Sequence, residues 1–480
     1  MDSLPPPVPG SEEPAPRGTQ VGQLLQGTRR FSAALKLVVI AVLIGVLHVP
    51  LLFIWGTLND REGLRDEATA EMGQTWGAAQ TLFGPVLAVP YTVTTRVPRP
   101  TVVGERVVQS EELRHTQGIA YFLPAHFSAE GALDVSERNR GIFRMPVYAA
   151  ELALAGEFRP DTAALGLDGA TFEWSRARLV LGLSDPHGLR APPRWTRDGA
   201  EVAFAPALPR AGGWGGIEAL VTGIADNAAP ASLPFSISIS LQGSQRIAFV
   251  PVGDANAVSL RGGWSDPSFD GAYLPVERSI DAAGFSARWE TTQFGRGFPA
   301  AWSEQAGRDG PPSYSLHGHA LGVTLATPVD TYRMVERSLK YAILVLTLVF
   351  AVYFLFEVTS PVRVHPLQYL MVGAALILFY LGFLALAEFV PVVVAYGGAA
   401  LASIVLVGGY SWSVLRAGRR SLLVTAGLGA TYGYLYFMLQ LQDYALLAGT
   451  GALFALLGAV MWFTRRLDWT RLEVRSPAAG

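Results

Sequence analysis

The sequence of 480 residues contains no cysteine. This absence excludes thiol catalysis, a disulfide framework, and zinc or iron–sulfur sites that are held by cysteine. A large domain outside the cytoplasm must therefore be held together by an ordinary apolar core, and about 280 residues are enough to form one.

Charge is also scarce, because only 16% of the residues are charged and the formal net charge is −2. That balance gives no indication of nucleic-acid binding. The chain contains only two lysines, Lys36 and Lys340, and each stands at the start of an apolar run, where its ammonium group can reach lipid headgroups. Half of the residues are apolar, too many for a soluble protein of this length and too few for a purely transmembrane one.

Five long apolar runs follow one another in the C-terminal part of the chain, at residues 341–358, 369–387, 391–412, 422–439 and 444–463. None has a Lys, Arg, Asp or Glu in its middle. A helix needs roughly 20 residues to cross a bilayer, and lipid offers no hydrogen-bond partners to an irregular backbone. We therefore expect residues 338–463 to form a block of five transmembrane helices, and not helices of a soluble core.

A sixth apolar run, residues 31–55, follows a proline-rich stretch and the pair Arg29 and Arg30. We expect residues 1–28 to be a disordered cytoplasmic tail. A cleaved signal peptide is the alternative, but the run is too long for one and no small-x-small cleavage site follows Trp55. The sequence thus predicts an uncleaved signal anchor, the first of six transmembrane helices.

The arginines predict the orientation of these helices, since cytoplasmic segments carry more positive charge. With the N-terminus inside, the cytoplasmic segments are the tail, residues 359–366, residues 413–421 and the C-terminal tail 464–480. They hold eleven arginines, with Arg29 and Arg30 included. The short joints on the other side hold none. We expect both termini in the cytoplasm of a bacterial inner membrane and residues 60–335 in the periplasm.

The region 59–335 begins with an amphipathic helix over residues 59–77, which we expect Gly84-Pro85 to end. Alternating apolar and polar residues then predict strands. The runs are 86–95, 119–127, 144–154, 178–183, 235–242, 247–252, 285–289 and 322–327. We expect one large antiparallel β domain, organised as a sandwich of two sheets and inserted between transmembrane helices 1 and 2, with a helical re-entry at 329–340. The strand order cannot be read from these patterns.

The candidate catalytic and metal-binding motifs lack the sequence context that their chemistry would require. His317-x-His319 on a strand would point two rings to one face as a metal pair, but a surface loop is the interpretation we favour. The stretch 184–187 (Ser-Asp-Pro-His) has the residue types of a hydrolase triad. Neighbouring residues in one turn, however, cannot form the hydrogen-bonded chain from serine through histidine to aspartate, and no Gly-x-Ser-x-Gly motif is present. We predict no catalytic, metal or cofactor-binding residues and no cofactor.

Several sequence blocks resemble the CreD family of bacterial inner-membrane proteins. One block runs Trp76-Gly77-x-x-Gln80-Thr81-Leu82-x-Gly84-Pro85, and another begins at Asp266-Pro267. Further blocks contain Glu336, Arg337, Lys340, Glu357, His365, Gln368 and Asp443. The resemblance covers roughly residues 60–470. It implies a role in cell envelope integrity, membership of a regulon under a sensor kinase and response regulator, and a link to β-lactam response. No reaction is attached to the family, so it supplies no catalytic residues.

Two hypotheses of function remain open. The first is a non-enzymatic envelope protein whose β domain binds or braces a periplasmic or cell-wall partner, with the bilayer as its other partner. The second is a membrane enzyme or transporter for a lipid or cell-wall precursor, suggested by Glu357, His365 and Gln368, which could hold a phosphate or a proton. We favour a structural role for these three residues, as caps of helix ends. The partner and the oligomeric state cannot be read from the sequence.

Overall fold

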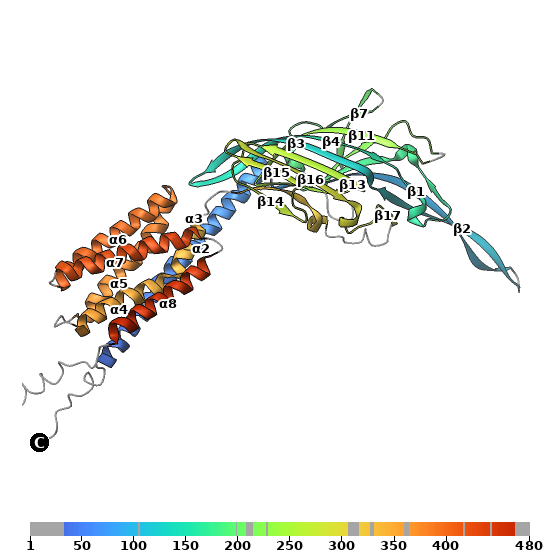
Figure 1. Cartoon of the computed structure of the whole chain (residues 1–480). Helices are drawn as coiled ribbons and strands as arrows, with labels where there is room; N and C mark the ends of the chain where they lie inside the picture. The colour runs from blue at the N-terminus through green and yellow to red at the C-terminus, as the bar shows by residue number, and fades with distance from the viewer. Residues whose placement is uncertain are drawn as a thin grey trace, which may run out of the picture. The chain divides into compact units, whose positions relative to one another are not determined.

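The computed structural model describes residues 33–103, 106–197, 199–207, 215–226, 229–305, 316–326, 331–359, 364–415, 418–441 and 444–465. The chain divides into two compact units (Figure 1). A helical unit contains Met1–Arg61 and Asp330–Gly480, and a β unit contains Glu62–Val329.

Each predicted apolar run coincides with one helix. The helices are α2 (Ala33–Trp76), α3 (Thr331–Lys340), α4 (Ala342–Thr359), α5 (Pro366–Ala387), α6 (Val392–Leu415), α7 (Gly418–Gln440) and α8 (Ala445–Thr464). Among the described residues, α2, α5, α6 and α7 are long and apolar enough to cross a membrane. The pair α3 and α4, bent by 44°, is a fifth candidate span.

The first helix differs from the prediction. Residues 31–55 and 59–77 were expected to form two helices, but α2 is continuous through Trp76 and contains Pro50. The helix ends at Gly77, whose φ of +140° favours glycine. Gly84-Pro85, the predicted break, lies inside a strand instead.

The interior of the helical unit is aromatic and contains a few polar groups that bond to one another. Phe379 of α5 packs against Tyr432 of α7, with ring centroids 4.4 Å apart. The Tyr396 hydroxyl donates to the Tyr432 carbonyl oxygen at 2.6 Å, and Ser403 Oγ lies 2.9 Å from the Tyr432 hydroxyl. These bonds satisfy polar groups in an interior that offers no water.

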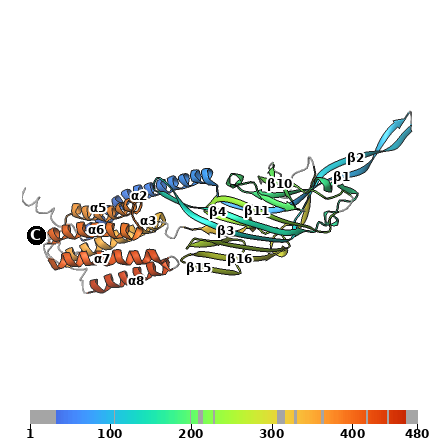
Figure 2. The ribbon, with the colours of Figure 1, turned by 90° about the horizontal axis from the view of Figure 1, so that it is seen from above.

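The β unit contains two sheets (Figure 2). A ten-stranded sheet has the order β14-β18-β12-β1-β6-β10-β9, with β2, β5 and β17 attached to β1 and β2, and an eight-stranded sheet has the order β15-β16-β13-β3-β4-β11-β7-β8. The strands of the first sheet are β1 (Gln80–Val103), β2 (Arg106–Phe122), β5 (Ala170–Phe172), β6 (Arg178–Leu183), β9 (Ala205–Ala207), β10 (Gly216–Leu220), β12 (Arg246–Val250), β14 (Pro267–Gly271), β17 (Ala301–Gln305) and β18 (Leu321–Leu325). The strands of the second are β3 (Pro124–Arg140), β4 (Phe143–Phe158), β7 (Arg194–Arg197), β8 (Ala200–Val202), β11 (Leu233–Ser244), β13 (Ala255–Gly262), β15 (Glu277–Asp281) and β16 (Gly284–Thr292).

The prediction of a purely antiparallel domain is wrong at two places. Strand β1 pairs with β12 in parallel, and β13 pairs with β3 in parallel. Two parallel strands must be joined by a long connection, and no local sequence pattern predicts which distant strands will pair in this way.

Both sheets contribute to one continuous apolar core, which includes the fully buried side chains of Trp195, Trp289 and Phe249. The clearest predicted strand is confirmed, because the apolar residues of β11, such as Phe235 and Ile237, point inward while Ser236, Ser238 and Ser240 point outward. The predicted strand 119–127 is in fact the end of β2 and the start of β3, and the chain crosses from one sheet to the other at Leu123, which is buried. Because the chain passes through the core at this crossing, its residues there are apolar. The sequence pattern of residues 119–127 therefore resembles that of a single strand.

Candidate functional site

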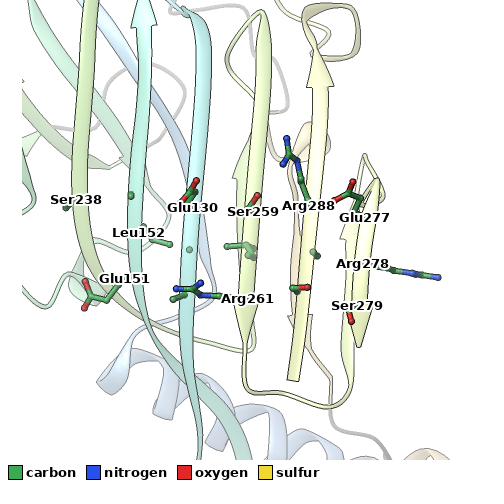
Figure 3. Close-up of a pocket in the computed structure, with 16 residues that line it drawn as sticks. Glu130, Glu151, Leu152, Ser238, Ser259, Arg261, Glu277, Arg278, Ser279 and Arg288 are labelled. Atoms are coloured by element: carbon green, nitrogen blue, oxygen red, sulfur yellow. The ribbon is translucent and has the colours of Figure 1, made fainter. Parts of the chain in front are cut away.

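The outward face of the eight-stranded sheet carries an open hollow, which we call the trough. It has a volume of about 680 Å³ and is lined mainly by residues of β3, β4, β13, β15 and β16 (Figure 3). Alternation in these strands sends apolar side chains into the core and leaves polar ones on this face. Among the described residues that line the trough none is aromatic, so they offer no flat surface for stacking against a sugar or a base.

The floor of the trough and the sheet around it consist of small side chains. Most outward positions of β3, β4, β11, β13 and β16 that carry no charge are alanine or serine. They are Ser128, Ala132, Ala149, Ala153, Ala155, Ser236, Ser238, Ser240, Ala255, Ala257, Ser259 and Ser286. β-Branched and aromatic residues stabilise strands better, so this floor costs stability and leaves room above the sheet.

Charged residues stand on this floor in two rows that cross the strands. In the first row Arg261 of β13 is opposite Ala132 of β3, which is opposite Glu151 of β4. In the second row Arg288 of β16 is opposite Ser259 of β13, which is opposite Glu130 of β3. Each row thus places an arginine and a glutamate on either side of one small residue.

Two of the four charged residues in these rows have no protein partner among the described residues. Among the described residues Arg261, Glu130 and Glu277 form no ion pair and no side-chain hydrogen bond. Glu151 accepts a hydrogen bond from Ser240 Oγ. Arg288 contacts Glu290 two residues along the same strand, at 2.7 Å, and both side chains are about half exposed. Such exposed pairs contribute little free energy, so Arg288 can exchange this partner for another.

The hollow continues along the same face. One extension of about 440 Å³ shares Ala132, Arg261 and Ser279 with the trough, and another hollow of about 640 Å³ is lined by Ser128, Ala257 and other residues. The face could accommodate a ligand considerably longer than one amino acid. Sequence reasoning missed this site, although the Ser and Ala residues at alternate positions of β11 and β4 were a signal.

The predicted family positions near the start of the β domain form a different feature, a junction that fixes the first strand. Gln80 is fully buried and donates to the carbonyl oxygens of Asp185 at 3.0 Å and Gln242 at 3.2 Å. Trp76 Nε1 donates to the Tyr148 carbonyl oxygen at 3.5 Å, and the guanidinium of Arg138 lies 4.5 Å from the Trp76 ring centroid. These contacts hold the end of α2 and the start of β1 on the β unit.

Asp185 completes this junction. Its Oδ2 accepts from the backbone N–H of Ala78 at 2.9 Å, and its Oδ1 accepts from the backbone N–H of His187 at 3.1 Å. Partial burial penalises the charged carboxylate, but the hydrogen bonds from Ala78 and His187 outweigh this penalty, so the pKa of Asp185 lies below its ordinary value. Ser184 Oγ accepts from the N–H of Thr81 at 2.9 Å. The three residue types of a hydrolase triad are therefore used here to fix a turn and a strand.

Other predicted positions lie at strand and helix ends. Gly84 and Pro85 lie at a shift in the pairing of β1 with β6, and the bond between them is cis. Asp266 accepts from Ser265 Oγ at 2.6 Å, next to Pro267, the first residue of β14. The structure does not bring these residues together with the trough.

Three further predicted positions lie on α3, and one of them ties this helix to α7. Arg337 donates to the carbonyl oxygens of Leu439 at 3.1 Å and Leu441 at 3.0 Å, and so caps the C-terminal end of α7. Lys340 forms an ion pair with Glu336, one turn earlier, at 3.0 Å. The cap explains why an arginine, with its several donors, stands at this position.

The predicted cluster of Glu357, His365 and Gln368 is engaged in local structure. Lys36, which we expected at the headgroups, forms an ion pair with Glu357, whose side chain is only 7% exposed. Glu357 also accepts from the Val364 N–H at 3.2 Å. His365 Nδ1 accepts from the N–H of Leu367, and Gln368 Oε1 accepts from the N–H of His365, which is a capping box for α5.

The remaining predicted positions are Asp443 and the histidine pair His317 and His319. Asp443 lies outside the described residues, and so does the side chain of His317. Residues Leu316–His319 form the 3-10 helix η5 and not a strand, so the geometry imagined for a metal pair is absent, and His319 packs edge-on against Phe298. Among the described residues, no group of three or more His, Asp or Glu side chains could hold a metal ion.

Long apolar helices together with a large β-rich unit define a multi-pass membrane protein. A family model described as "Inner membrane protein CreD" matches residues 32–470. The chain is also 29% identical over 427 residues to "Inner membrane protein CreD" of Escherichia coli (strain K12), which covers 88% of this chain and 91% of the relative. The chain therefore belongs to the CreD family of inner membrane proteins.

Proposed function

We propose that this protein is a non-enzymatic contributor to cell envelope integrity, and that its β unit binds an envelope component in the trough. The observation that carries the proposal is a hollow floored by Ala and Ser with charges, such as Arg261 and Glu130, that have no partner in the part of the protein that the structure describes. A floor of poor strand formers has a cost in stability that a ligand site explains. Three residues suggested an enzyme or transporter, and they have local partners instead: His365 and Gln368 form a capping box for α5, and Glu357 pairs with Lys36.

The proposed topology has six spans, namely α2, the bent pair α3 and α4, and α5 to α8. Both termini are cytoplasmic and residues 60–335 are periplasmic, as the arginine distribution favours. Membership of an envelope-stress or β-lactam regulon is the corresponding proposal for its regulation.

The absence of cysteine makes the topology directly testable. A Ser259→Cys variant and an Arg419→Cys variant each contain a single thiol. In cells with a permeabilised outer membrane, a maleimide that cannot cross the inner membrane should label the first and not the second. Labelling of Arg419→Cys in intact inner membranes would contradict the orientation.

Site-specific photocrosslinking in living cells tests the trough. A photoreactive residue at Ser238 or Ser259 should yield a discrete crosslinked product with an envelope protein or cell-wall material. The matched control is Thr171 of β5, an exposed position on the other sheet. The same products at Thr171 as in the trough, or none at either place, would count against a binding role for the trough.

A further inference from the structure

The two rows of the trough have the same construction. Arg261 and Glu151 stand on either side of Ala132, and Arg288 and Glu130 stand on either side of Ser259. In both rows the arginine is on the β13–β16 side and the glutamate on the β3–β4 side. In Figure 3 the side chain of Arg261 extends over β3 toward the side of Glu151.

The spacing within a row matches a small zwitterion. Neighbouring strands are about 4.8 Å apart, so the arginine and glutamate backbones of one row are separated by about 9.6 Å. An α-amino acid head has its ammonium nitrogen and its carboxylate oxygens about 3 Å apart. With a hydrogen bond of about 2.9 Å at each end, such a head spans about 9 Å. The head would fit above the intervening Ala or Ser when both side chains of a row stand upright from the sheet, and in the first row this requires the Arg261 side chain to turn away from its position over β3.

The charges define the orientation of the ligand. A guanidinium binds a carboxylate in a bidentate manner, and a glutamate accepts from an ammonium group. Both partners of the first row face this space, since Arg261 has no ion pair among the described residues and Glu151 accepts only from Ser240. Without an aromatic ring in the lining, stacking against a sugar is not the basis of recognition.

We infer that the trough binds a peptide whose side chain ends in an α-amino acid head, with the carboxylate on Arg261 and the ammonium on Glu151. A peptide fits better than a free amino acid because the hollow continues beyond the first row in both directions. This inference rests on the proposed function, because it names the chemistry of the component bound in the trough.

Two tripeptides test the inference on the full-length protein in lipid nanodiscs. They differ only in the third residue, which is meso-diaminopimelate in one and lysine in the other. The diaminopimelate side chain ends in a complete amino acid head, whereas the lysine side chain has the amine and no carboxylate. The wild-type protein should bind the diaminopimelate peptide at least about tenfold more tightly, as expected for a charge-assisted contact.

Three variants separate the two contacts. Arg261→Gln should weaken binding of the diaminopimelate peptide to the level of the lysine peptide and leave the lysine peptide unchanged. Glu151→Gln should weaken both peptides, because both have the ammonium group. Arg278→Gln is the control, since Arg278 is at the β15 edge of the trough and its side chain extends away from Arg261 and Glu151 (Figure 3), and it should change neither affinity.

Equal affinities of the wild-type protein for the two peptides would overturn the inference, and so would discrimination that survives in Arg261→Gln. Crosslinks from Ser259 in either of those cases would show that the trough still has an envelope partner, so the proposed function would stand. Loss of crosslinks together with absent peptide binding would reject both.

Discussion

The carboxylate of Asp185 accepts a hydrogen bond from the backbone N–H of Ala78, with a distance of 2.9 Å between Oδ2 and N. The two residues are 107 positions apart in the sequence, and the bond fixes the segment that leads from α2 into β1. Gln80 donates to the backbone carbonyl oxygen of Asp185 in the same junction, so this residue contacts the start of the first strand through its backbone as well as through its side chain.

Asp185→Ala should destabilise the protein by about 1–3 kcal/mol, since it leaves the N–H of Ala78 without a partner. Asp185→Asn should cost less, because the amide oxygen can still accept that bond. Melting of the purified protein in detergent measures both. Equal stability of wild type and Asp185→Ala would show that the bond contributes nothing.

The same aspartate predicts a pH dependence. Its pKa is lower in the folded protein than its ordinary value of 3.8, so its charged form contributes stability above that value. The contribution is lost as the pH falls below 3.8 through the pKa of the folded state. The difference in melting temperature between wild type and Asp185→Asn should therefore be constant near neutral pH and shrink below 3.8. A difference that grows in acid would have the wrong sign.

Lys36→Met leaves the carboxylate of Glu357 without its cation, although that side chain is only 7% exposed. Removal of one partner of a buried pair is costly, and because Lys36 is about one-third exposed we expect a reduced loss of about 1–3 kcal/mol. The double variant Lys36→Met/Glu357→Gln should recover part of it. Thermal stability in detergent is the measurement, and a double variant no better than the single one would contradict the pairing.

Arg337→Ala should destabilise the end of α7, since the guanidinium donates to the Leu439 and Leu441 carbonyl oxygens. We expect a loss of about 2 kcal/mol for bonds from a charged group. Arg337→Lys should restore only part, because an ammonium group cannot reproduce the fork of the guanidinium. Limited proteolysis around residue 441 provides the test, in which full protection of Arg337→Lys would argue against the need for two separate donors.

His365→Ala separates the capping role from the enzyme or transporter hypothesis. Loss of the cap of α5 should cost about 1 kcal/mol, and His365→Asn should restore it because asparagine is a good N-cap residue. The lipid composition of cells with His365→Ala should match wild type, since His365 Nδ1 is taken by the Leu367 N–H. A changed lipid profile at normal protein levels would revive a role in lipid chemistry.

Ser259→Thr tests the cost of the small floor. A β-branched residue at this outward position should raise stability, by less than about 1 kcal/mol, because it suits a strand better than serine. The variant should also yield fewer crosslinks from a photoreactive residue at Ser238, since the threonine methyl group enters the space between Arg288 and Glu130. A variant with both higher stability and undiminished crosslinking would show that the floor is not shaped for a ligand.

Much of the fold was predictable because its causes are local. The predicted apolar runs coincide with α4 to α8, and the alternation predicted for residues 235–242 matches their burial in β11. The capping role of His365 and Gln368 also follows from neighbouring residues. The continuous α2 was missed because nothing local separates a helix that enters a membrane from one that continues beyond it.

The sequence by itself determined a cysteine-free membrane protein with a large β-rich domain. The length of an apolar run and the alternation of apolar and polar residues in a strand are properties of each segment alone. Only the tertiary structure decided which distant residues meet. Glu357 pairs with Lys36 across 321 positions, and Arg261 comes beside Ala132 and Glu151 only because β13 pairs in parallel with β3. The trough depends on this register, which results from the packing of the whole core and leaves no mark in any single strand.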